Sequence, residues 1–130
     1  AIYTYVPPQE ATETVHRRLT TQNFNYHGLT ANNIKKLLET ILKRRIFTFK
    51  NQLYEQTHGL AMGSRLSGFL ATLVMDDLER RTLTSDLQIG LYARYVNDTL
   101  ILTTDSSKAD SIYERMNSAH ECLKFEIEKP

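Results

Sequence analysis

Residues 91–103, LYARYVNDTLILT, place two apolar, β-branched runs on either side of an Asn97-Asp98 pair. Runs rich in Tyr, Val, Ile and Thr that a short polar pair separates are typical of a β-hairpin. Asn and Asp suit its turn because both tolerate the left-handed backbone that two-residue hairpin turns require. The sequence therefore predicts a hairpin with Asn97 and Asp98 at its tip. The pair could serve the turn alone, or it could hold a carboxylate rigidly at a sheet end, as two-metal phosphoryl chemistry requires.

The rest of the chain alternates between strand-like and helix-like patterns. Apolar spacing predicts strands over 1–6, 46–50, 53–57 and 122–127, and helices over 9–21, 31–45, 65–83 and 108–120. Thr30 is the expected N-cap of the helix over 31–45, and Asp105, Ser106 and Ser107 are candidate caps of the helix over 108–120. Asn51-Gln52 is the expected turn of the first hairpin. This order indicates an α+β fold, a mainly antiparallel sheet with helices packed on one face.

Composition limits the possible classes of protein. The chain has 130 residues and a net charge of +1, so overall charge does not argue for nucleic acid. Its single cysteine, Cys122, excludes an internal disulfide framework and a cysteine-based zinc site. No apolar run is long enough to cross a bilayer and no signal peptide is visible, so we expect an intracellular protein. Because residues 1–6 already resemble the middle of a strand, we expect one partial domain of a longer chain.

Residues 58–68, HGLAMGSRLSG, form the glycine-dense stretch of the sequence and lead directly into the expected helix 65–83. A strand, a glycine loop and a helix in this order allow backbone to approach a ligand closely. The spacing is neither that of a P-loop nor that of a dinucleotide-binding fingerprint. Taken alone, the stretch could equally be a linking turn or a binding loop.

Two clusters of charged side chains have an ordinary and a functional interpretation. The cations of the expected helix 31–45 could contact a phosphate backbone, although a solvated helix face explains them as well. Asp76, Asp77 and Glu79 suggest a metal site, but Arg80 and Arg81 lie at helical spacing and favour ion pairing. The first cluster comprises Lys35, Lys36, Lys43, Arg44 and Arg45.

Four segments in the same order resemble the palm domain of reverse transcriptases, most closely those of Penelope-like retroelements. That family has a strand Asp-Val-x-Ser-Leu-Phe-Thr-Asn-Val-Pro, a loop Tyr-x-Gln-x-x-Gly-x-Ala-Met-Gly-Ser-Pro-Leu-Ser-Pro, a hairpin Arg-Tyr-Val-Asp-Asp, and a Phe-x-x-Glu-x-Glu ending. The counterparts here are AIYTYVPPQEA, YEQTHGLAMGSRLSGFLATLVMDDLE, RYVNDTLIL and MNSAHECLKFEIEKP. The likeness covers nearly the whole chain, and it implies a palm sheet and an RNA-directed DNA polymerase.

The resemblance also implies roles for individual residues. Tyr3 matches the aromatic residue under the sugar of the incoming nucleotide, and Ala1 and Ile2 would present backbone to its triphosphate. The glycine loop would position template and nucleotide. Asn97 and Asp98 match the catalytic carboxylates at the hairpin tip, with Asp98 as a ligand of Mg²⁺. The matching loop residues are Gln56, Met62, Gly63, Ser64 and Ser67. The implied partners are an RNA template, a DNA primer, a dNTP and the rest of the parent polypeptide, in a nuclear setting.

Departures from the family pattern concern the chemistry. The family's first catalytic Asp falls upstream of Ala1, Asn97 replaces the first Asp of the hairpin pair, and Arg65 and Gly68 replace prolines. Asp98 is then the one expected carboxylate left in the chain. We therefore expect a catalytically incomplete palm fragment in which Tyr3, Gly63 and Asp98 line one cleft.

A second hypothesis needs no catalysis. The chain could be a nucleic-acid-binding domain derived from a reverse transcriptase, with cationic side chains on the phosphate backbone. Its candidate residues are Lys35, Lys36, Arg44, Arg45 and Arg94. A plain structural α+β domain is the third possibility that the composition allows.

Overall fold

The computed structural model describes residues 4–61 and 64–130, and within them it confirms the expected α+β class. The described strands form three separate two-stranded antiparallel hairpins, so the expected larger palm sheet is not seen in this part of the chain. Internal contacts divide the chain into one unit that ends at Val74 and another that begins at Met75. The boundary falls inside helix α3 (Arg65–Thr82).

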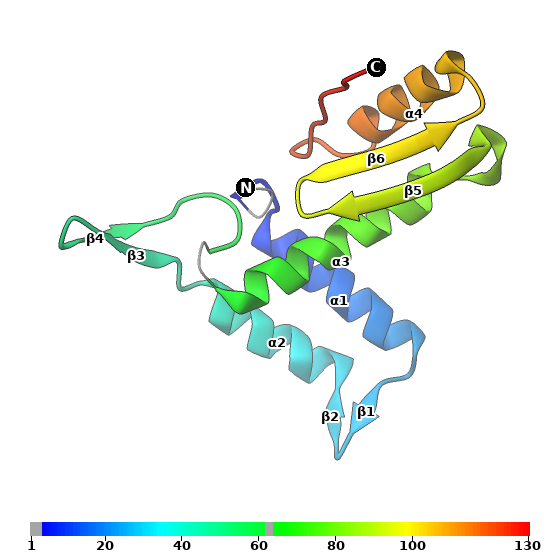
Figure 1. Ribbon diagram of the computed structural model, residues 1–130. Helices are drawn as coiled ribbons and strands as arrows, with labels where there is room; N and C mark the ends of the chain where they lie inside the picture. The colour runs from blue at the N-terminus through cyan, green and yellow to red at the C-terminus, as the bar shows by residue number, and fades with distance from the viewer. Residues whose placement is uncertain (1–3, 62–63) are drawn as a thin grey trace. The chain divides into compact units, whose positions relative to one another are not determined.

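Helices α1 (Pro8–Thr21) and α2 (Ala31–Leu42) lie side by side in the first unit (Figure 1). Thr30 caps α2 as expected, in a capping box in which it and Asn33 exchange hydrogen bonds. Between α1 and α2, where the sequence predicted no strand, strands β1 (Asn25–Tyr26) and β2 (Leu29–Thr30) form a short hairpin.

The β3–β4 hairpin follows α2 and projects away from α1 and α2 (Figure 1). Strand β3 (Ile46–Phe49) pairs with β4 (Gln52–Glu55), and the turn is Lys50-Asn51. The expected turn at Asn51-Gln52 is wrong by one residue. Lys50 and Asn51 both have positive φ, 49° and 62°, as a tight hairpin turn of this twist requires.

Helix α3 confirms the helix expected over 65–83. Its side chains Leu70, Val74 and Leu78 are almost fully buried, whereas Phe69 is 59% exposed. On its polar side, Arg80 pairs with Asp76 at 3.0 Å, and Arg81 pairs with Asp77 at 3.5 Å. The ion-pairing interpretation of these two aspartates is confirmed.

In the second unit, a 3-10 turn η2 (Ser85–Leu87) leads into a hairpin of strands β5 (Ile89–Tyr95) and β6 (Asp98–Thr103). The predicted central hairpin is therefore present, with Tyr95 opposite Asp98. Its two turn residues are Val96 and Asn97, so Asp98 begins β6 instead of closing the turn. The register shifts once, between Ile89 and Leu91.

Of the three candidate caps of helix α4 (Ser106–Ser118), Asp105 is the N-cap, and its carboxylate accepts a hydrogen bond from the Lys108 amide at 3.0 Å. The strand expected over 122–127 is absent. The Asn117 side chain instead exchanges two hydrogen bonds with the backbone of Phe125, at 2.7 and 3.1 Å. This amide takes the place of a partner strand and holds the extended chain against the end of α4.

The prediction of a strand over residues 1–6 is wrong for residues 4–6, the part that the structure describes. Thr4 belongs to a 3-10 turn, Tyr5 to a turn and Val6 to a bend, and the Val6 side chain is fully buried. Pro7 is the N-cap residue of α1 and Pro8 is its first residue, a position that suits proline because the amide there has no partner within the helix. Residues 1–3 lie outside the described part of the chain.

Candidate functional site

The glycine loop between β4 and α3 is held by side chains that hydrogen-bond its carbonyl groups. The four successive carbonyl oxygens of residues 58–61 each accept such a bond. Gln56 Nε2 donates to those of residues 58 and 60 at 2.5 and 2.8 Å. Arg45 Nη1 donates to that of residue 59 at 3.3 Å, and Ser67 Oγ donates to that of residue 61 at 2.6 Å. Three side chains thus determine the path of this loop.

Gly59 brings the same loop against the chain that precedes α1. Its φ of +72° lies in the left-handed region, where side chains are disfavoured. A Cβ added at Gly59 would overlap the Thr4 carbonyl group and would lie 2.6 Å from the Thr4 Cα. Glycine is therefore required here by both conformation and space. The glycine loop therefore lies directly against the backbone of Thr4.

The tip of the β5–β6 hairpin has a strained backbone. Val96 adopts a φ of 52°, a region in which a β-branched residue is a rare outlier. Such a conformation costs about 1–3 kcal/mol and persists where the surrounding structure imposes it. The flanking residues Asn97 and Asp98 are exposed. The predicted catalytic pair therefore occupies a solvent-facing tip, and only one member of it carries charge.

A cluster centred on Glu79 holds this hairpin to the C-terminal half of α3. Glu79 Oε1 accepts hydrogen bonds from Tyr92 Oη at 2.8 Å and from Arg94 Nε. The Arg94 and Glu79 side chains are only 17% and 14% exposed. Burial, and then the bond to Glu79, raise the pKa of the Tyr92 phenol above its usual range. Because removing one partner of a buried pair leaves the other unpaired, this cluster fixes the hairpin strongly.

Sequence reasoning missed this cluster, although a signal for it exists. Tyr92 and Arg94 are two residues apart and so face the same side of β5, the side opposite Leu91 and Ala93. A cation on the inward face of a strand requires an acidic partner. Glu79 is the acidic residue of α3 that its own arginines leave available, because Asp76 and Asp77 pair within the helix.

A second missed interaction joins η2 to α4. The Arg115 guanidinium binds both carboxylate oxygens of Asp86, at 3.2 and 2.9 Å, and also donates to Thr84 Oγ1 at 2.8 Å. The hydrogen bond from Arg115, followed by that from Thr84, holds the pKa of the Asp86 carboxyl well below its usual range. This bidentate pair is structural, since it joins two elements of the same unit.

The structure brings together some of the predicted site residues. Gln56 and Ser67 hold one loop, and the exposed Ser64 belongs to it through its carbonyl, which accepts from the Ser67 amide at 3.2 Å. Asn97 and Asp98 lie on the hairpin tip of the other unit. The remaining predicted residues lie outside the described part of the chain: Ala1, Ile2, Tyr3, Met62 and Gly63. The common cleft therefore stays a prediction.

The described residues do not fit a bound pair of Mg²⁺ ions. Among residues 4–61 and 64–130, no group of three or more His, Cys, Asp or Glu side chains could hold a metal. Asp98 supplies one carboxylate, and the neutral Asn97 precedes it. Two-metal sites need several carboxylates held together, so the metal expectation has no support from this part of the chain.

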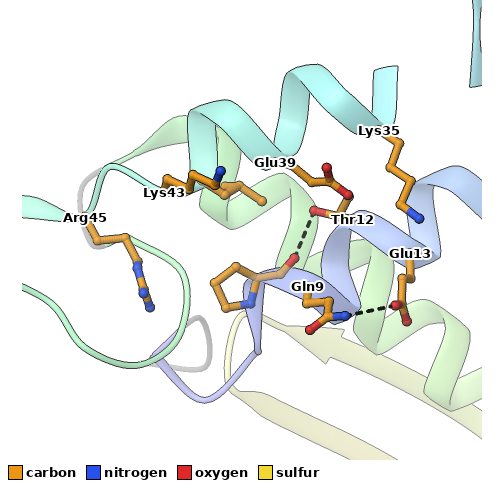
Figure 2. Close-up of a pocket in the computed structure, with 9 residues that line it drawn as sticks. Gln9, Thr12, Glu13, Lys35, Glu39, Lys43 and Arg45 are labelled. Atoms are coloured by element: carbon orange, nitrogen blue, oxygen red, sulfur yellow. Dashed lines mark hydrogen bonds between the residues drawn. The ribbon is translucent and has the colours of Figure 1, made fainter. Parts of the chain in front are cut away.

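The proposed phosphate-binding cations are not equivalent. Arg94 is engaged by Glu79, and Arg45 donates to the glycine loop. Lys36 and Arg44 are exposed. A pocket of about 300 Å³ lies among α1, α2 and the chain that follows α2 (Figure 2). Cations and carboxylates are mixed in its lining, so it does not strongly favour either an anion or a cation; its charged residues are Glu13, Lys35, Glu39, Lys43 and Arg45.

Comparisons with family models, curated proteins and solved structures find no match for the chain. The likeness to reverse transcriptases therefore depends on the motif residues quoted above. Separately, none of the described helices combines the length and the apolar character needed to cross a membrane.

Proposed function

We propose that this chain is a palm fragment of a retroelement reverse transcriptase, a family that performs two-metal nucleotidyl transfer, and that it is catalytically incomplete. The observation that carries the proposal is the construction of the glycine loop. Gln56, Gly59 and Ser67, three residues of the motif match, shape it together with Arg45, which lies outside the motif. A chance motif match would leave such residues unrelated in space. Here each one acts on the same turn of backbone.

The close approach of Gly59 to Thr4 adds support. A palm site needs the chain around its first motif to lie against the glycine loop, because both contact one nucleotide. The backbone contact between Gly59 and Thr4 joins those two motifs. The strained φ of Val96 is a further supporting feature, since strain of this kind clusters at functional sites.

The loss of charge at the hairpin tip is the reason to expect no polymerisation. A unit charge about 4 Å from a divalent ion contributes roughly 8 kcal/mol at an effective dielectric near 20, before desolvation. Even a quarter of that, about 2 kcal/mol, exceeds a tenfold change in affinity. Asn97 supplies a neutral carbonyl in that place. We therefore expect the chain to show no Mg²⁺-dependent incorporation of dNTPs on a primed RNA template.

The substitution Asn97→Asp tests whether the tip is a depleted metal site. It places a second carboxylate beside Asp98, and we expect Mn²⁺ affinity, measured by calorimetry, to rise at least tenfold. Asn51→Asp is the matched control, because Asn51 also lies in the two-residue turn of an exposed hairpin and has no acidic neighbour. Equal gains in the two variants, or no gain in either, would refute the proposal.

A further inference from the structure

The β3–β4 hairpin carries an exposed aromatic cluster on one of its faces. Phe47 and Tyr54 lie opposite each other and stack, with ring centroids 5.6 Å apart and planes 20° apart. Phe49 lies 6.4 Å from Tyr54 on the same face. The exposed fractions of Phe49 and Tyr54 are 57% and 41%. We call Phe47, Phe49 and Tyr54 the aromatic platform.

The surroundings of the aromatic platform are cationic. Lys50 Nζ lies 5.4 Å from the Phe49 ring centroid, and Lys43, Arg44 and Arg45 precede the hairpin in the sequence. Residues 43–57 contain four cationic side chains and a single acidic one, Glu55, whereas the whole chain is nearly neutral. Glu55 lies opposite Ile46, which places it on the other face of the ribbon.

We propose that the aromatic platform binds single-stranded nucleic acid, with bases stacked on the rings and phosphates beside the cations. Aromatic rings combined with a positively charged track are the features by which proteins hold single strands without reading sequence. The positive charge near the rings favours a nucleic acid over a protein segment, because an apolar protein segment would pack better on an aliphatic face. The opposite face, with Ile46 and Leu53 exposed by 65% and 77%, is of that aliphatic kind. The proposal uses residues 43–57 alone and does not depend on the polymerase assignment.

The absence of tryptophan from the sequence allows a direct test of stacking. Phe49→Trp introduces a single fluorophore on the aromatic platform, and Leu53→Trp introduces it on the opposite face as the matched control. On titration with oligo(dT) of 20 nucleotides, we expect saturable quenching in Phe49→Trp and little change in Leu53→Trp. Equal quenching in both variants, or none in Phe49→Trp, overturns the proposal.

Affinity measurements separate stacking from charge. With labelled oligo(dT), Tyr54→Ala should weaken binding about 5- to 100-fold, whereas Tyr54→Phe keeps the ring and should bind as the wild type does. Leu53→Ala should change affinity less than twofold. Circular dichroism verifies that each variant is folded. If Leu53→Ala weakens binding as much as Tyr54→Ala, or if a duplex of the same length binds as tightly as the single strand, the platform is not a base-stacking surface.

The result also separates this inference from the proposed function. If Asn97→Asp does not raise the affinity for Mn²⁺, the palm assignment is refuted, whereas binding of oligo(dT) by the hairpin is unaffected. Conversely, an aromatic platform that mediates self-association, seen as Phe49-dependent dimers in sedimentation with no quenching by oligo(dT), would overturn the inference while the palm assignment stands.

Discussion

Glycine is required at position 59 for two reasons, its left-handed backbone and the lack of space for a side chain. These reasons can be separated by comparing Gly59→Ala with Gly28→Ala and Gly68→Ala. Gly28 has a φ of +88° with open space around it, so alanine there meets conformational strain alone. That strain is about 1–2 kcal/mol, partly offset by the reduced entropy of the unfolded chain, and we expect a net loss of about 1 kcal/mol. Gly68 lies in helix α3 with open space around it, so Gly68→Ala should raise the free energy of unfolding by about 0.5–1 kcal/mol.

Gly59→Ala adds a steric term to the same conformational strain. Its Cβ would lie 2.6 Å from the Thr4 Cα, and the obstructing atoms are backbone, which cannot move aside as a flexible side chain would. Overpacking of this kind costs about 1–3 kcal/mol, so we expect a total loss of about 2–4 kcal/mol. Urea unfolding followed by circular dichroism measures all three variants. If Gly59→Ala loses no more stability than Gly28→Ala, the approach of the glycine loop to Thr4 is refuted.

Two further predictions concern the second unit. The Val96→Gly variant should be more stable than the Val96→Ala variant by about 0.5–1 kcal/mol, because glycine relieves the left-handed strain that alanine retains. At Ala93, in the same hairpin, the order should be reversed, so that Ala93→Gly lowers the stability. Urea midpoints in which glycine is not the more stable residue at position 96 would contradict the strain. Asp86→Asn should lower the urea midpoint at pH 7, because the folded pKa of Asp86 is depressed and its contribution is present above the unfolded value, 3.8. That contribution is lost as the pH falls through the folded pKa, so the difference from the wild type should narrow below pH 3.8, and a constant difference would show that the Arg115 pair is not responsible.

Local chemistry predicts much of this fold from the sequence. Thr30 and Asp105 cap helices because their side-chain oxygens reach amides three residues on. Asp76 and Asp77 pair with arginines at the helical spacing that the sequence displays. These interactions join residues within one turn of helix, so no knowledge of the tertiary structure is needed to find them.

The wrong predictions arise where a tertiary contact decides the outcome. The segment 122–127 has the composition of a strand, but its backbone bonds are taken by Asn117 and by His120, whose Nδ1 accepts from the amides of residues 122 and 123 at 3.0 and 3.1 Å. The hairpin turns each lie one residue earlier than Asn51-Gln52 and Asn97-Asp98 would suggest. At Val96 the register of the strands overrides the preference of the residue itself.

The candidate site shows the same division. The resemblance identified Gln56 and Ser67 from the sequence. The hydrogen bonds that Gln56, Ser67 and Arg45 donate to the loop carbonyls are seen only in the folded structure. Glu79 was considered as a metal ligand beside two aspartates, whereas it accepts from Arg94 fifteen positions away. Pairing at that sequence distance depends on how the hairpin folds back onto α3, which spacing along the chain does not reveal.

The uneven survival of the palm motifs has a physical explanation under the proposed function. Gln56, Gly59 and Ser67 bind or accommodate backbone, so replacing any of them destabilises the loop whether or not the protein catalyses a reaction. Asp98 and Asn97 are exposed at a hairpin tip, where a change of charge has little effect on folding. A palm released from the need for catalysis would therefore keep Gln56, Gly59 and Ser67 while a carboxylate of the hairpin tip is replaced, as at Asn97. The departures at Arg65 and Gly68 fall in the first turn of α3.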